Sequence, residues 1–139
     1  MKKYNSHRIK IPYKEATQLH KEGKLLLGIT DELSINILSI KALRPKNKSV
    51  VIAFYLWFFI GFLGLCYSIY LSFTSEWWIF IVGFICFRIL TSCNNKAHIQ
   101  NILEEAMRDE DFYNNILSIN GWLYQITEND AQNYLVENK

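Results

Sequence analysis

The sequence predicts a membrane α-helical protein, with a two-helix transmembrane hairpin and a small cytosolic α+β unit formed by both terminal arms. The first observation is a pair of apolar runs, 50–73 and 77–95, separated by three residues. The first run has no charged residue, and at about 1.5 Å rise per residue it exceeds a hydrocarbon core of about 30 Å. The second observation is that polar arms flank the runs on both sides.

The two arms differ sharply in charge. Residues 1–49 carry eleven Lys or Arg and four Asp or Glu, whereas residues 94–139 carry three basic and eight acidic residues. We therefore expect a basic arm (1–49), a hairpin (50–96) and an acidic arm (97–139). The opposite charges favour docking of the arms on each other.

Basic residues near the apolar runs predict the topology. Lys41, Arg44, Lys46 and Lys48 precede the first run, Lys96 follows the second, and the turn has no basic residue. The positive-inside rule then places both termini in the cytoplasm of a multi-pass protein of the bacterial inner membrane. Anionic membrane lipid is the expected partner of the four charges that precede the first run, at about 1 kcal/mol each.

Arg88 is the one charge within the second run. A guanidinium at the bilayer centre costs about 2.5–3.5 kcal/mol on insertion scales. Because Arg88 lies in the cytoplasmic half, we expect its side chain to extend to the inner headgroups. The alternative is that it lines an oligomeric pore.

Small residues recur along the two runs and predict close helix packing. Packing within the hairpin is the first interpretation, and association of identical chains in the membrane is the alternative. The candidate packing residues are Gly61, Gly64, Ser68, Ser72 and Gly83.

The basic arm has the pattern helix, strand, helix. Pro12 and Gly23 delimit a short helix at 13–22, and residues 24–29 favour a strand. Thr30 then caps a helix expected to run to about Leu43 and to end at Pro45. Its buried side should carry Leu33, Ile37, Ile40 and either Leu43 or Arg44.

The acidic arm has helices, a strand and a short helix. Residues 97–107 either continue the second apolar helix or begin a new one. Asp109 or Asp111 caps a helix to about Ser118, which Asn120 and Gly121 terminate. A strand at 122–126 follows, and Thr127 caps a last helix whose apolar residues are Tyr134, Leu135 and Val136.

The segments 23–38 and 121–135 resemble each other, since each has a glycine, an apolar strand, Ile-Thr and an acidic first turn. This similarity suggests a structural repeat. A two-stranded ribbon is unstable alone, so we expect the two strands to pair beneath the flanking helices. The residues expected in this pairing are Leu25, Leu26, Leu27, Leu123 and Tyr124.

The sequence contains no pattern typical of catalysis, metal binding or cofactor binding. His7, His20 and His98 are widely separated, and the three cysteines all lie in the apolar runs. No glycine-rich phosphate loop is present. Basic residues are spread along the first arm, which favours lipid rather than nucleic acid.

These patterns predict a non-enzymatic membrane protein that binds a protein partner, as an immunity protein or a small regulatory subunit. The alternative is an effector that oligomerises into a pore, motivated by Arg88 and the small residues. A sustained polar stripe, which an aqueous pore needs, is missing from both runs. An enzyme acting on lipid through Glu105 or Asp109 is a third, weaker hypothesis.

Overall fold

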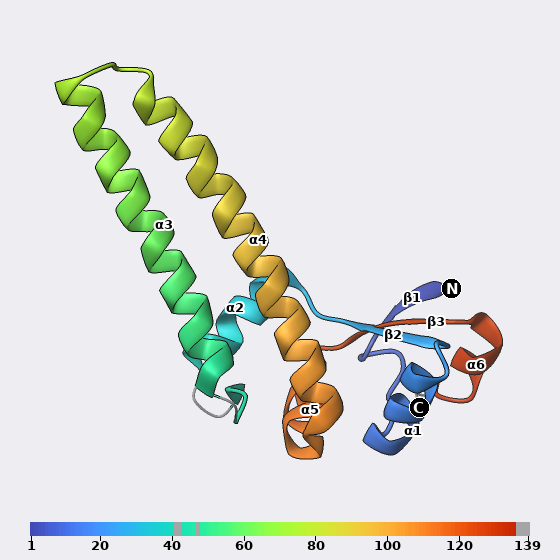
Figure 1. Cartoon of the computed structure of the whole chain (residues 1–139). Helices are drawn as coiled ribbons and strands as arrows, with labels where there is room; N and C mark the ends of the chain where they lie inside the picture. The colour runs from blue at the N-terminus through green and yellow to red at the C-terminus, as the bar shows by residue number, and fades with distance from the viewer. Residues whose placement is uncertain (41–42, 47, 136–139) are drawn as a thin grey trace. The chain divides into compact units, whose positions relative to one another are not determined.

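The computed structural model describes residues 1–40, 43–46 and 48–135 and divides into two compact units. The hairpin unit comprises residues 47–100, and the tail unit comprises residues 1–46 and 101–139. The chain is mostly helical, with two long apolar helices and a small three-stranded sheet (Figure 1), which confirms this part of the predicted fold. Lys41 and Val136 lie outside the described residues.

The hairpin unit consists of helix α3 (Lys48–Thr74) and the first part of helix α4 (Ile79–Arg108). Both are long and apolar enough to cross a membrane. The second helix begins two residues later than predicted, because Trp77 and Trp78 lie in the turn that reverses the chain. Backbone hydrogen bonds from Ile79 to Glu76 and from Ile81 to Trp78 close this turn.

Helix α4 continues without interruption to Arg108, which settles the alternatives left open for residues 97–107. Its last turns belong to the tail unit, where Ile102 and Ala106 are fully buried. The four-residue spacing of Ile102 and Ala106 places both side chains on one helix face, and this face packs into the core of the tail unit.

Three antiparallel strands form the sheet of the tail unit: β1 (Lys2–Asn5), β2 (Leu25–Gly28) and β3 (Leu123–Ile126). The strand order is β1-β3-β2, so β3 lies between two strands of the amino-terminal arm (Figure 1). The expected strands pair in the register Leu27 with Tyr124. Strand β1 was not predicted, because its residues lack an alternating apolar pattern.

Helices α1 (Tyr13–Lys21), α2 (Asp31–Ser39), α5 (Glu110–Ser118) and α6 (Glu128–Gln132) complete the tail unit. The hydroxyl of Thr30 accepts a hydrogen bond from the backbone of Leu33 at the start of α2. Thr127 precedes α6, but its hydroxyl contacts the Asp130 carboxyl group instead of the helix backbone. Helix α6 ends at Gln132, so Tyr134 and Leu135, which were expected to be its apolar residues, lie beyond it, and that prediction is wrong.

Helix α2 ends at Ser39, which corrects the prediction that it reaches Leu43. Ile40 is extended and exposed, and the Arg44 Nε donates a hydrogen bond to the carbonyl of Leu38. This side chain supplies the partner that a terminal helix carbonyl otherwise lacks. Ile37 and Leu43 are buried as expected, and Leu33 is half-buried.

An aromatic cluster forms the centre of the tail unit. Tyr113, Trp122 and Tyr124 are fully buried, and the rings of Tyr113 and Trp122 stack with their centroids 5.5 Å apart. The Tyr113 hydroxyl donates a hydrogen bond to the Ile11 carbonyl, and the Trp122 Nε1 donates one to the Tyr113 carbonyl. Residues from both arms therefore share one core.

Candidate interaction surfaces

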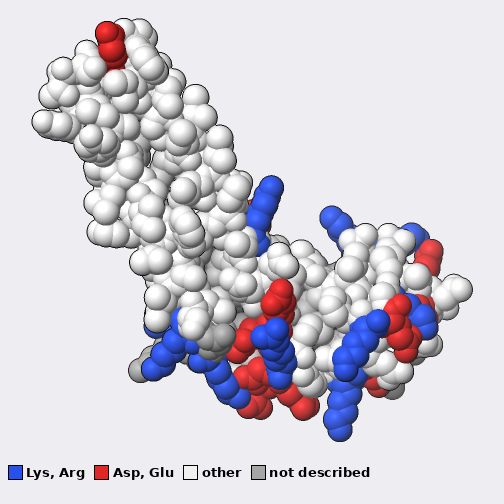
Figure 2. All heavy atoms as spheres, in the orientation of Figure 1, with Lys and Arg blue, Asp and Glu red and all other residues white. Residues whose placement is uncertain are grey.

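Large apolar side chains cover the outside of the hairpin unit. Phe73 is 86% exposed and Trp77 is 73% exposed. On the face of the hairpin unit that Figure 2 shows, Lys, Arg, Asp and Glu are almost absent. Such a continuous apolar surface is unfavourable in water and marks a site of contact with lipid or with other apolar surfaces. Further exposed members are Ile52, Leu56, Phe59, Phe62, Leu63, Tyr67, Tyr70, Ile81, Phe84 and Ile85.

Three of the five candidate packing residues, Gly61, Ser68 and Gly83, lie in the contact between α3 and α4. A Cβ atom at Gly61 would lie 2.8 Å from Leu90, and one at Gly83 would clash with the buried Ser68 side chain. By contrast, apart from the neighbouring residues and backbone of α3 itself, no heavy atom among the described residues lies within 4 Å of the Cβ position of Gly64. The expected contact at Gly64 is therefore not made within the hairpin, and Ser72 instead donates its hydroxyl to the Ile69 carbonyl.

The half of the hairpin unit near its chain ends carries polar contacts between the helices. The Asn94 side chain on α4 donates a hydrogen bond to the carbonyl of Phe54 on α3, with a donor to acceptor distance of 3.0 Å. The buried His98 ring packs against the Phe54 ring, with centroids 4.7 Å apart. These contacts were not predicted, although an asparagine at the end of an apolar run was a usable signal.

One face of α4 and Trp57 of α3 line an open apolar groove of about 510 Å³. Four of the lining residues, Cys86, Leu90, Cys93 and Ala97, follow one another on α4 at spacings of three and four residues. This periodicity explains why the residues share one helix face. The two cysteines are free thiols and are exposed in this groove.

The basic residues expected beside the membrane have different environments. Lys48, Arg88 and Lys96 are exposed in the hairpin unit. Arg44 and Lys46 belong to the tail unit and contact other residues of that unit. Lys41 lies outside the described residues. Positions beside an apolar run were thus easy to find in the sequence, but their individual contacts were not.

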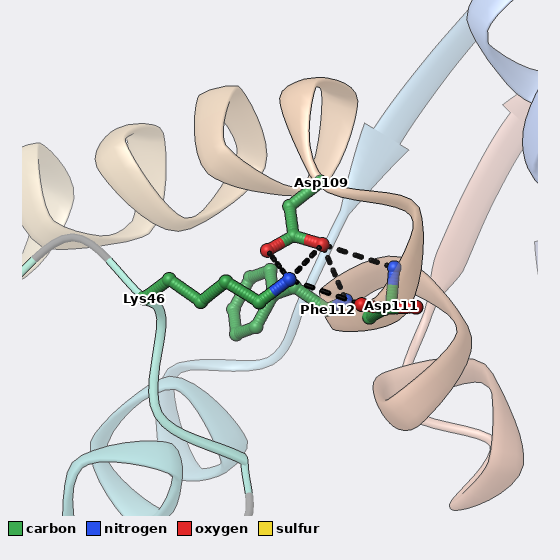
Figure 3. A network of polar contacts seen from close by, with 4 residues as sticks. All are labelled: Lys46, Asp109, Asp111 and Phe112. Atoms are coloured by element: carbon green, nitrogen blue, oxygen red, sulfur yellow. Dashed lines mark hydrogen bonds and ion pairs between the residues drawn. The ribbon is translucent and has the colours of Figure 1, made fainter.

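Lys46 and two acidic residues form a polar network in the tail unit (Figure 3). The Lys46 Nζ lies 2.9 Å from Asp109 Oδ2 and 3.0 Å from Asp111 Oδ2. Asp109 also accepts backbone hydrogen bonds from Asp111 and Phe112, which makes it the N-cap of α5. The network connects Lys46, two residues before α3, to the start of α5.

The charges in this network shift each other's proton affinity. The hydrogen bond from Lys46 lowers the pKa of the Asp109 carboxyl group, and the carboxylates of Asp109 and Asp111 raise the pKa of Lys46. Each charge therefore favours the ionised form of its partner. The attraction predicted between the arms takes the form of this network and of a second ion pair, between Lys2 and Glu128.

The residues expected to pair the arms lie on two faces of the sheet. Leu25, Leu27 and Tyr124 are buried in the core, whereas Leu26 is 50% exposed and Leu123 is half-buried. The alternation follows from the two-residue period of a strand. The face that carries Leu26 and Leu123, together with Lys3, Asn5 and Gln125, is called the open sheet face below.

No group of three or more His, Cys, Asp and Glu side chains arranged to hold a metal ion occurs among the described residues. His20 Nδ1 lies 3.1 Å from the Leu25 carbonyl oxygen, so this ring contacts the edge of β2. His98 belongs to the hairpin unit, as described above.

Comparisons with models of protein families, with characterised proteins and with solved structures find no match to this chain.

Proposed function

We propose that this chain is an integral protein of the bacterial cytoplasmic membrane that binds a protein partner, as an immunity protein or a small regulatory subunit. The observation that carries the proposal is the exposure of the large apolar side chains of α3 and α4. Apolar side chains exposed over two helices of this length are stable when lipid surrounds them. The hairpin therefore crosses the bilayer twice and fixes the tail unit at the membrane.

The proposed orientation has both termini in the cytoplasm. It is supported by Arg44, Lys46 and Lys48 before α3 and by Lys96 in α4, whereas the turn contains Glu76 and no basic residue. Trp77 and Trp78 in the turn suit the outer interface, because indole rings prefer the headgroup region.

The open sheet face is the proposed contact surface for the partner. It combines the exposed Leu26 of β2 with polar side chains of β1 and β3, and a mixed apolar and polar surface is typical of protein interfaces. The core beneath it includes Tyr113, Trp122 and Tyr124 and holds the strands in one conformation.

The test is co-expression of the full chain with the product of each neighbouring gene, with growth as the readout. An immunity protein should restore growth that the neighbouring product arrests. Leu26→Asp, on the open sheet face, should abolish this protection, and Lys14→Gln on α1 should retain it. Protection that survives Leu26→Asp would exclude this surface, and failure of the unchanged chain to protect would contradict the immunity role.

A photo-crosslinking amino acid at position 26 tests the regulatory-subunit version of the proposal. It should yield one discrete product in living cells, and the same amino acid at Lys14 should not. The crosslinked protein must also lose its normal activity or level when the chain is deleted. A product formed equally from both positions would count against a specific surface.

A further inference from the structure

Helix α4 carries a short polar stripe on one face. The stripe begins at Arg88 and continues with Ser92, Asn95 and Lys96, which lie four, seven and eight residues further along the chain. These spacings place the four residues on the same side of a helix. Arg88, Ser92 and Lys96 are exposed, and Asn95 is half-buried. Among the described residues, the side chains of this polar stripe make no hydrogen bond or ion pair, so their donors are available to a ligand.

The positive charge of the polar stripe is not balanced by an acidic residue nearby. Glu76 is the one acidic residue between positions 48 and 100, and it lies in the turn at the other end of the hairpin. Arg88 and Lys96 thus require a counter-charge from outside the hairpin unit. In a region next to hydrocarbon this requirement is stronger than in water.

The same face of α4 is apolar in the residues that precede Arg88. Ile81 and Ile85 precede Arg88 by seven and three residues and are 44% and 52% exposed. Along this face the chain therefore presents apolar side chains first and hydrogen-bond donors second. A phospholipid has the same order, with acyl chains followed by a phosphate.

The spacing suits a single headgroup. Arg88 and Lys96 are eight residues apart, or about 12 Å along the helix axis. Their long side chains can converge over Ser92 and Asn95. A guanidinium donates two parallel hydrogen bonds to phosphate oxygens, and an ammonium adds a point charge.

We propose that this stripe, with Ile81 and Ile85, is a binding site for an anionic phospholipid of the cytoplasmic leaflet. Arg88 and Lys96 hold the phosphate, Ser92 and Asn95 donate to headgroup oxygens, and the two isoleucines contact an acyl chain. The inference rests on the proposed membrane crossing of the hairpin. It specifies that Arg88 and Lys96 select an anionic lipid over a zwitterionic one.

The test is a lipid titration of the full chain in detergent, followed by native mass spectrometry. The probes are phosphatidylglycerol and phosphatidylcholine with the same acyl chains. Two basic groups at a membrane surface should favour the anionic lipid by about 30-fold. The double variant Arg88→Gln and Lys96→Gln should lose this preference, and the matched double variant Lys14→Gln and Lys21→Gln on α1 should keep it.

The variant Arg88→Lys keeps the positive charge but loses the two parallel hydrogen bonds of the guanidinium. It should therefore retain only part of the preference for phosphatidylglycerol. Equal affinity of the unchanged chain for both lipids would overturn the proposal and leave an acidic side chain of a partner helix as the ligand. A preference that persists in Arg88→Gln and Lys96→Gln would also overturn it. Loss of preference in the α1 control as well would show that net charge alone attracts the lipid.

Alkaline carbonate extraction of cell membranes keeps this test separate from the membrane proposal. The unchanged chain and all variants should remain in the membrane fraction. Release of the unchanged chain by carbonate would contradict the membrane crossing itself. Suppose instead that every variant stays in the membrane fraction and the double variant Arg88→Gln and Lys96→Gln keeps its preference for the anionic lipid. This result would contradict the lipid site and leave the membrane crossing in place.

Discussion

The hydroxyl oxygens of Tyr113 and Tyr124 lie 2.8 Å apart in the core of the tail unit. Tyr113 donates its proton to the Ile11 carbonyl, so Tyr124 donates to Tyr113. The pair connects the amino-terminal arm, helix α5 and strand β3. Through the hydrogen bond of Tyr113 to Ile11, it joins segments that are 102 residues apart in the chain.

Tyr113→Phe should destabilise the tail unit by about 1–3 kcal/mol, because it leaves the Ile11 carbonyl and the Tyr124 hydroxyl without their buried partner. Thermal unfolding of the purified full chain in detergent, followed by near-ultraviolet circular dichroism, measures this effect. Tyr67→Phe, at an exposed position on α3, is the control and should leave the transition unchanged. Equal shifts in both variants would contradict a special role for the buried pair.

The same pair predicts a loss of stability at alkaline pH. Burial raises the pKa of Tyr124 from 10.0 to about 12, and burial raises the pKa of Tyr113 further. A raised pKa in the folded state means that the folded chain holds the protons more tightly than the unfolded chain. The stabilisation is therefore complete below about pH 10 and is lost as the pH rises through the folded values.

Denaturant unfolding at pH 8, 10 and 11 measures this dependence. The free energy of unfolding should fall between pH 10 and 11, and the fall should be smaller when both tyrosines are replaced by Phe. A pH dependence of the same size in the double variant would assign the effect to other groups.

Asp109 has two separable roles, as the N-cap of α5 and as the partner of Lys46. Asp109→Ala removes both and should destabilise the tail unit by about 0.5–2 kcal/mol, the usual cost of losing a cap. Asp109→Asn keeps a capping oxygen and should recover most of this loss. The melting temperature of the full chain is the measurement, and equal destabilisation by both substitutions would show that the charge matters more than the cap.

The two glycines Gly64 and Gly83 form a matched pair in the hairpin unit. Gly83→Leu places a side chain against Ser68 and should destabilise the packing of α3 on α4 by about 1–3 kcal/mol. Gly64→Leu projects into open space and should leave the melting temperature in detergent unchanged. A loss of stability in Gly64→Leu instead would indicate that this face contacts a second chain.

The sequence predicted the features that depend on local pattern. The two apolar runs predicted α3 and α4 because length and lack of charge are sufficient signals. The caps Thr30 and Asp109 were found because a short polar side chain before an acidic first turn is a local signature. The pairing of β2 with β3 followed from the similarity of the two arms, and both strands lie in one sheet.

Features that depend on distant segments were missed. The β1 residues Lys2–Asn5 have no apolar alternation and become a strand only through pairing with β3. Gly64 lies four residues before Ser68 and was therefore expected on the same packed face of α3. Which residues of that face contact α4 depends on how the two helices cross. The ion pair of Lys46 with Asp109 joins residues 63 positions apart. The charges of the arms predicted attraction, but not which side chains meet.

We propose that the hairpin crosses the membrane twice, with both termini in the cytoplasm. Alkaline phosphatase, which is active only outside the cytoplasm, tests this claim when it is fused after Lys139 or inserted between Ser75 and Glu76 of the full chain. We expect activity for the insertion in the turn and none for the carboxyl-terminal fusion. Activity of the carboxyl-terminal fusion, or an inactive enzyme in the turn at equal expression, would contradict it.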